Sequence, residues 1–140
     1  MAFGLRKDAK VELLSTVPLF AGLSKRQLAR LASIADQLEV RQGKVLIREG
    51  ALGQEFFILL DGKVEVSRKG KKLATRGKGE FYGEIALVSD VPRVATVTAV
   101  SPLRVLVIRD REFRELLEDT PAVAIKVLKA LAKRVPTAQF

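Results

Sequence analysis

The sequence predicts a mainly β domain with flanking helices, in which an eight-stranded β-roll or jelly roll carries helices from both ends of the chain. Short apolar runs separated by turn residues fill the region 39–109, and about eight such runs are typical of this architecture. Apolar residues recur at helical spacing before and after that region. The 140 residues are enough for one domain with a single sizeable core. We therefore expect a single domain over 1–140, with an N-terminal helical part (15–38), a β-roll (39–109), C-terminal helices (110–135) and a tail (136–140).

Two helices are predicted near the N-terminus, a short one followed by a longer one. A modest apolar stripe indicates a helix over about residues 8–16, which ends near Pro18. Ser24 then begins the second helix, because Gln27 stands three residues later in the pattern of a capping box. The residues of this helix that we expect to pack inward are Leu28, Leu31, Ala32, Ala35 and Leu38.

Turn residues divide the β region into short strands. The predicted strands are 38–41, 45–48, 56–60, 63–68, 72–76, 94–100 and 104–108. Asp61-Gly62 predicts a two-residue hairpin of type I′ between the third and fourth of these strands, a turn that needs positive φ at both positions. Gly70 marks the tip of a second hairpin, and residues 79–83 are interpreted as a glycine turn.

Two helices are predicted to close the chain. Asp110 is expected to cap the first, which runs to about Glu118 and buries Phe113, Leu116 and Leu117. Thr120 followed by Pro121 is typical of a helix start. The stripe expected to pack inward on the last helix is Ala124, Val127, Leu128, Leu131 and Val135.

Composition excludes several function classes. The chain contains no cysteine and no histidine, so it lacks thiolate nucleophiles, the usual general base and the commonest zinc ligand. No acid–base pair stands at a persuasive spacing, and we expect no enzyme, no metal site and no cofactor. No apolar run approaches the ~20 residues that span a bilayer, and the N-terminus lacks a secretory signal. We therefore expect a cytoplasmic protein that does not bind membranes.

The formal net charge of +9 raises the alternative of nucleic-acid binding. The basic residues are spread along the chain, and the one dense cluster is Arg68-Lys69-Gly70-Lys71-Lys72 at the predicted hairpin tip. A β-barrel that binds single strands through this tip would need stacking side chains among the basic ones. The chain has one tyrosine and no tryptophan, so a solvated loop is the favoured interpretation.

The stretch from residue 79 to residue 97 carries the functional signal. Glu84 follows Gly83, and Arg93 follows the rigid Pro92. Free backbone N–H groups are expected from Gly83 through Ile85 to Ala86, and such groups bind anions. A guanidinium grips two phosphate oxygens at once and a carboxylate accepts from a ribose hydroxyl, so the set suits a sugar phosphate. The alternative is an ordinary surface salt bridge between Glu84 and Arg93.

These residues resemble the phosphate-binding cassette of the cyclic nucleotide-binding domain family. The resemblance rests on Tyr82-Gly83-Glu84-Ile85-Ala86-Leu87 and on Arg93-Val94-Ala95-Thr96-Val97, and it extends over about residues 15–135. It implies that Arg93 binds the cyclic phosphate and that Glu84 binds the ribose 2′-hydroxyl. Backbone amides near Ala86 and Ala95 would complete the cradle.

The resemblance also implies where the base would lie. The strand positions that commonly touch the base fall on Val66, Ala74 and Arg76. Relatives usually carry an aliphatic residue at the third position, so Arg76 either stacks on or hydrogen-bonds the base, or it points outward. Val94 lacks the hydroxyl that relatives selective for cGMP place there, which tilts the expectation toward cAMP. Arg134 aligns with a base-capping arginine, and the alternative is an exposed arginine late in a helix.

The resulting hypothesis is a cyclic nucleotide sensor or regulatory domain, which signals by movement of its C-terminal helix. Its ligand is cAMP or cGMP, with cAMP favoured. The output would pass to an unidentified downstream protein or through self-association of the C-terminal helix. The alternative keeps the fold without the ligand, as a scaffold that binds protein through the last helix.

Overall fold

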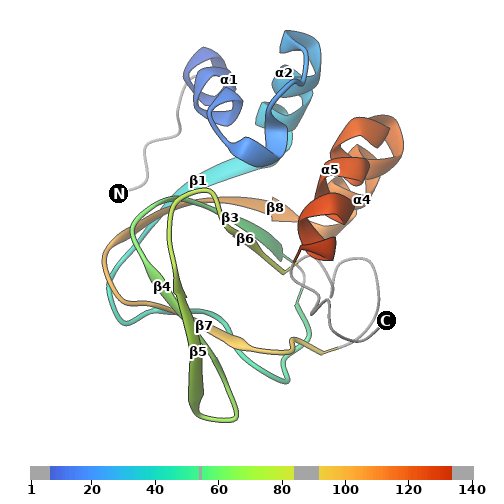
Figure 1. Ribbon diagram of the computed structural model, residues 1–140. Coiled ribbons are helices and arrows are strands. Elements are labelled where there is room, and N and C mark those ends of the chain that lie inside the picture. Colours follow the sequence, from blue (N-terminus) through green and yellow to red (C-terminus); the bar gives the residue numbers. More distant parts are fainter. Residues whose placement is uncertain (1–6, 54, 84–91, 134–140) are drawn as a thin grey trace.

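The computed structural model describes residues 7–53, 55–83 and 92–133 (Figure 1). Within these residues eight strands lie between helices at the two ends of the chain. The strands form two antiparallel sheets of four strands each. This confirms the predicted β-roll with flanking helices.

The first sheet places strands distant in sequence side by side. Its order is β1 (Ala35–Val40), β8 (Leu103–Arg109), β3 (Glu55–Asp61) and β6 (Phe81–Tyr82). The short strand β6 pairs Tyr82 with Phe57 and Phe81 with Ile58, so the predicted glycine turn at 79–83 is wrong in part.

The second sheet lies on one face of the first. Its order is β2 (Val45–Ile47), β7 (Thr96–Ala99), β4 (Val64–Arg68) and β5 (Lys71–Arg76). Strand β5 is at the edge of this sheet and is exposed over most of its length. Figure 1 shows the β4–β5 hairpin at the end of the molecule opposite α1 and α2.

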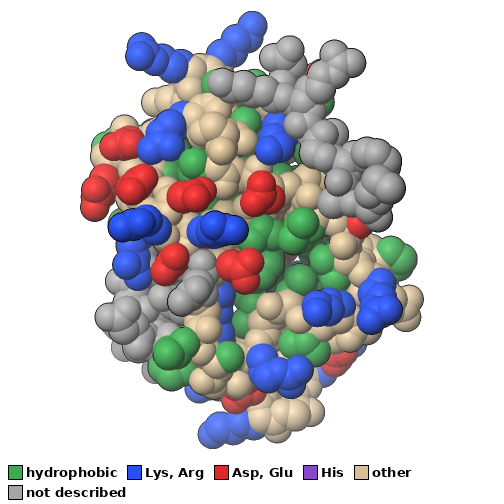
Figure 2. Space-filling model, turned by 180° about the vertical axis from the view of Figure 1, so that it is seen from behind, with side chains coloured by type: hydrophobic (Ala, Val, Ile, Leu, Met, Phe, Trp, Pro, Cys, Tyr) green, Lys and Arg blue, Asp and Glu red, His purple; other side chains and the backbone are tan. Residues whose placement is uncertain are grey.

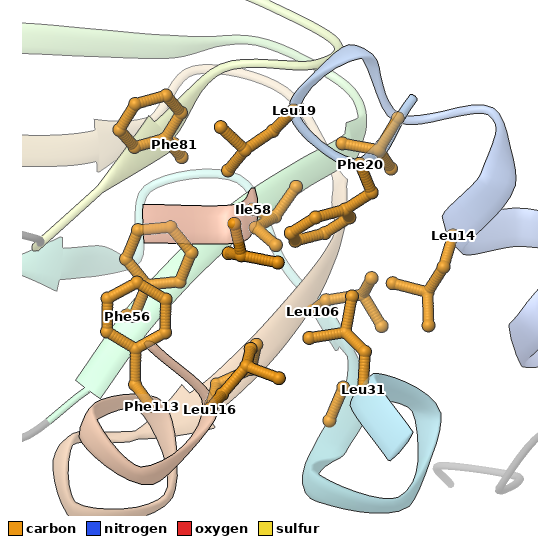
Figure 3. Close-up of a cluster of buried hydrophobic side chains, with 14 of the residues drawn as sticks. Leu14, Leu19, Phe20, Leu31, Phe56, Ile58, Phe81, Leu106, Phe113 and Leu116 are labelled. Atoms are coloured by element: carbon orange, nitrogen blue, oxygen red, sulfur yellow. The ribbon is translucent and has the colours of Figure 1, made fainter. Parts of the chain in front are cut away.

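Strands β3 and β8 are buried on both faces, which explains their continuous apolar runs. On β3, Phe56, Ile58 and Leu60 belong to a core cluster shared with the helices, whereas Phe57 and Leu59 belong to a cluster between the two sheets. The same alternation continues on β8. Figure 3 shows the helix-side cluster, where side chains from β3, β8 and the helices point toward one another. The first sheet is therefore the middle layer of three.

The N-terminal helices are α1 (Lys7–Ser15), the 3-10 turn η1 (Pro18–Phe20) and α2 (Lys25–Ile34). The predicted capping box is confirmed. Ser24 Oγ accepts from Gln27 N at 3.1 Å, and Gln27 Oε1 accepts from Ser24 N at 2.9 Å.

The predicted helix to residue 38 is too long, because α2 passes directly into β1 at Ala35. Leu38 pairs with Val105 in the ladder, whereas Ala35 pairs with Ile108 and belongs to the helix-side core. Residues three apart on a strand face opposite sides, and β1 is an edge strand. Leu38 is therefore 40% exposed instead of packing inward.

At the C-terminal end, α4 (Asp110–Asp119) packs on β3 through Phe113, which stacks on Phe56 with ring centroids 4.3 Å apart. Phe113 and Leu116 are buried as predicted. Asp110 is the first residue of the helix and not its cap, since Arg109 holds the cap position.

The last helix, α5 (Pro121–Ala132), begins after Thr120 as predicted but presents a different face. Val123 and Val127 are buried. Leu128 is 67% exposed and Ile125 is 52% exposed, so the expected burial of Leu128 is wrong. Almost every side chain of this helix is apolar or lysine, and the spacing alone does not select one face.

The Asp61-Gly62 turn does not form the predicted hairpin. Strand β3 belongs to the first sheet and β4 to the second, so the turn carries the chain from one sheet to the other. Gly62 has φ 95°, while among the described non-glycine residues only Lys69 has positive φ. Lys69 (φ 52°) and Gly70 (φ 75°) instead make the tight hairpin between β4 and β5, at the predicted tip.

Candidate functional site

The backbone of Arg93 is tied to the loop that joins β2 to β3. Arg93 N donates to Ala51 O at 2.8 Å, and Gly50 N donates to Arg93 O at 2.8 Å. This pair of bonds fixes the residue after Pro92 against a segment that is distant in sequence. The position of Arg93 therefore depends on the loop as much as on its own neighbours.

The side chain of Arg93 runs back along the same loop. It is only 8% exposed, and its Nη2 donates to the backbone carbonyl of Glu55 at 2.7 Å. A buried guanidinium needs such acceptors, because desolvating a charge without partners is costly. The loop thus holds Arg93 through its main chain at one end and through its guanidinium at the other.

Two glycines make room for this guanidinium. A Cβ on Gly53 would lie 1.7 Å from Arg93 Nε, and a Cβ on Gly83 would lie 2.5 Å from Nη1. Gly83 also has φ 99°, a conformation that residues with a side chain rarely adopt. Gly83 was predicted as part of the site from its motif. Gly53 and the Glu55 carbonyl were missed, and two glycines three apart in the loop were the only sequence signal.

A cavity of about 320 Å³ opens beside Arg93. It is lined by β2 with the following Arg48, by the loop residues Ala51, Leu52 and Gly53, and by Glu55 and Arg93. Two arginines, Arg93 and Arg48, contribute to this lining, together with one acidic residue, Glu55. This hollow has the chemistry to hold an anionic group.

The residues predicted to meet the base lie together on the second sheet. Val66 pairs with Ala74, and Val64 pairs with Arg76. Directly paired residues share a face of the sheet, and Val64 is fully buried between the two sheets. All three residues, Val66, Ala74 and Arg76, therefore lie on the face of the second sheet that is turned toward the first. Arg76 is nevertheless exposed, because it lies on the edge strand. None of these three residues belongs to the lining of the cavity beside Arg93, as far as the described residues form it.

The remaining predicted positions are divided between described and undescribed parts of the chain. Val94 is 51% exposed and Ala95 is half-buried, both just before β7. The predicted strand at 94–100 begins only at Thr96. Glu84, Ile85, Ala86 and Arg134 lie outside the described residues.

The dense basic cluster of the sequence lies at the tip of the β4–β5 hairpin. The hairpin-tip residues Arg68, Lys69, Lys71 and Lys72 are exposed, and Lys69 N donates to Glu49 Oε1 at 2.9 Å. On the face seen in Figure 2, acidic and basic side chains are interspersed around a hollow lined by hydrophobic ones. The described helices include none long and apolar enough to cross a membrane. In the same part of the chain, no three potential metal ligands cluster.

Comparisons with known proteins connect this chain with a described family. A model of the family described as "Cyclic nucleotide-binding domain" matches residues 37–120. A cAMP-dependent protein kinase regulatory subunit of Yarrowia lipolytica is 36% identical over 106 residues, which are 74% of this chain and 28% of that subunit. This chain thus spans less than a third of that relative.

Solved structures show the same fold. The catabolite activator protein of Thermus thermophilus is 30% identical with a TM-score of 0.75, over 84% of this chain and 57% of that one. The regulatory subunit of a cAMP-independent protein kinase A from Trypanosoma brucei is 27% identical with a TM-score of 0.81. The match covers 91% of this chain and 46% of that one.

Proposed function

This chain belongs to the cyclic nucleotide-binding domain family, and we propose that it is a regulatory domain that binds a cyclic nucleotide, cAMP in preference to cGMP. The observation that supports this most is Arg93, a buried arginine held at the edge of a cavity by main-chain bonds and by the Glu55 carbonyl. A preorganised guanidinium loses little side-chain entropy when it meets a phosphate.

In this proposal Arg93 binds the cyclic phosphate. Backbone N–H groups at Gly83, Ile85, Ala86 and Ala95 would surround the same phosphate, and Glu84 would accept from the ribose 2′-hydroxyl. The positive φ of Gly83 and its contact with the guanidinium support its place in the cradle. No residue of this set performs a reaction, so the domain binds its ligand and is not an enzyme.

The base would lie against Val66 and Ala74 on the inward face of the second sheet. Arg76 lies on the same face of the sheet, because it pairs with the buried Val64. This favours Arg76 reaching the base over the alternative in which it points outward. Val94 has no hydroxyl for guanine, which supports cAMP. One solved relative is named cAMP-independent, so the nucleotide has to be measured.

The signal of ligand binding would be transmitted by movement of α5, and Arg134 would cover the base. Ile125 and Leu128 on α5 are exposed and apolar, which suits a surface that contacts a downstream protein or a second copy. The same exposure supports the alternative of a ligand-free scaffold. Light scattering separates the two. A change in mass that occurs without nucleotide and is lost in Leu128→Ser favours the scaffold, and a change that needs cAMP favours the sensor.

Isothermal titration with cAMP and cGMP tests the proposal directly. Wild type is expected to bind with a dissociation constant below ~10⁻⁴ M. Arg93→Ala removes charged hydrogen bonds to phosphate and is expected to weaken binding about 100-fold. Arg41→Ala makes the same charge change in an exposed loop between β1 and β2 and should bind like wild type. Absence of heat for both nucleotides with folded wild type refutes the sensor.

A further inference from the structure

Gly53, in the β2–β3 loop, lies against the Arg93 side chain. A Cβ built on Gly53 would lie 1.7 Å from Nε, 1.9 Å from Cζ and 2.1 Å from Nη2. All three distances are about half of a normal non-bonded separation. The guanidinium therefore occupies the space that any larger residue at position 53 would fill.

Space, and not backbone conformation, is the reason for a glycine here. Gly53 is not among the described residues with positive φ, so an L-residue could adopt its backbone angles. Gly83 differs in this respect. It has φ 99°, and its Cβ would lie 2.5 Å from the backbone carbonyl of Glu55 as well as 2.5 Å from Nη1.

Residues before and after this glycine, in the loop and at the start of β3, bond Arg93. Gly50 N and Ala51 O bond the arginine backbone at 2.8 Å each, and Glu55 O accepts from Nη2 at 2.7 Å. The guanidinium lies between these anchors and against Gly53. A side chain at position 53 would have to displace either the guanidinium from the Glu55 carbonyl or the loop from the arginine backbone.

We propose that Gly53 is a positioning residue for Arg93, which leaves open the slot that holds the guanidinium at the cavity edge. This rests on the proposed function to the extent that the guanidinium meets a phosphate there. Gly53 itself lines the cavity, but the Cβ added in Gly53→Ala would meet the Arg93 side chain. The substitution is therefore expected to disturb binding by moving Arg93.

The steric part is tested without nucleotide, by thermal unfolding of Gly53→Ala in two backgrounds. With Arg93 present, the substitution is expected to lower the unfolding midpoint by about 5 °C or more. In Arg93→Ala the obstacle is gone, and the same substitution should change the midpoint by less than about 2 °C. An equal loss in both backgrounds, or no loss in either, overturns the inference.

Two glycines serve as matched controls. Gly77→Ala meets only Gly62 O at 3.7 Å, an ordinary contact, and should unfold like wild type. Gly83→Ala clashes with backbone and has positive φ, so it should remain destabilised after Arg93→Ala. If Arg93→Ala rescued Gly83→Ala as fully as Gly53→Ala, the special role of position 53 would be refuted.

Binding of cAMP separates positioning from general stability. Gly53→Ala is expected to weaken cAMP binding about tenfold or more at a temperature where it is folded. Ile108→Val trims the helix-side core and lowers stability, but it should bind like wild type. Equal affinity of wild type and Gly53→Ala overturns the positioning role. Failure of wild type to bind either nucleotide overturns the proposed function alone, because the coupling between positions 53 and 93 is measured without ligand.

Discussion

Arg93 shows at the scale of one residue how a charge is held inside a β domain. Its guanidinium is desolvated, and a main-chain carbonyl that cannot rotate away accepts its Nη2 proton. Surface arginines lose rotamer freedom when they bind an anion, whereas this one has already lost it on folding. The entropy cost of ordering the Arg93 side chain is therefore met on folding, before a ligand binds.

Replacement of Arg93 by lysine keeps the charge and removes the planar fork. We expect Arg93→Lys to weaken cyclic nucleotide binding by about 1–3 kcal/mol, because a single ammonium cannot both bond Glu55 O and grip a phosphate with two parallel donors. Titration calorimetry measures the loss. Arg41→Lys is the control, and wild-type affinity in Arg93→Lys would show that charge alone suffices.

The motif predicts Arg93 and Gly83 as site residues because both stand in one short stretch, and the structure brings the two into contact. It did not identify Gly53 and the Glu55 carbonyl, which lie about 40 residues earlier and meet the arginine only after the chain folds. Contacts to a main-chain carbonyl leave no trace in residue type. The roles of Val66, Ala74 and Arg76 stay predictions, now with a register that places all three on one face.

At the scale of one element, α2 illustrates a boundary that side chains specify locally. Ser24 and Gln27 satisfy two backbone donors reciprocally at its N-terminus. Local signals of this kind are reliable because they involve residues three apart. The C-terminal boundary depends instead on pairing with β8, which is distant in sequence, and was placed four residues too late.

Loss of the cap should cost about 0.5–2 kcal/mol in the free energy of unfolding, measured by urea denaturation of Ser24→Ala. Ser33→Ala in the same helix is the matched control. Its Oγ only donates to Arg30 O within the helix at 2.6 Å, so the change should stay within about 0.5 kcal/mol. Equal losses for the two serines would contradict the capping role.

Two other elements show why some predictions failed. The apolar residues of α5 surround most of the helix, and only contact with the core at Val123 and Val127 decides its orientation. Asp61-Gly62 has the composition of a hairpin turn, but the strands on either side enter different sheets. Partner choice between sheets is a long-range property, which a two-residue signal does not encode.

For the whole molecule, the shared strands β3 and β8 join the two core clusters into one unit. Leu106 belongs to the helix-side cluster and its neighbour Val105 to the cluster between the sheets, and both are fully buried. Loss of either cluster therefore uncovers one face of the strands on which the other cluster also rests. This predicts a single cooperative unfolding transition.

Scanning calorimetry tests this with two substitutions on adjacent residues. The calorimetric and van't Hoff enthalpies of wild type should agree. Leu106→Ala should lower stability by about 2–5 kcal/mol and Val105→Ala should lower it too, each shifting the same single transition. Separate transitions, moved individually by the two variants, would show that the layers unfold independently.

The chain has one tyrosine and no tryptophan, and that tyrosine stands in β6 directly before the glycine that faces the guanidinium. With excitation at wavelengths that phenylalanine does not absorb, the fluorescence of this tryptophan-free chain originates from a single phenol ring. That fluorescence therefore reports on the surroundings of Arg93, the proposed phosphate contact, without an attached dye.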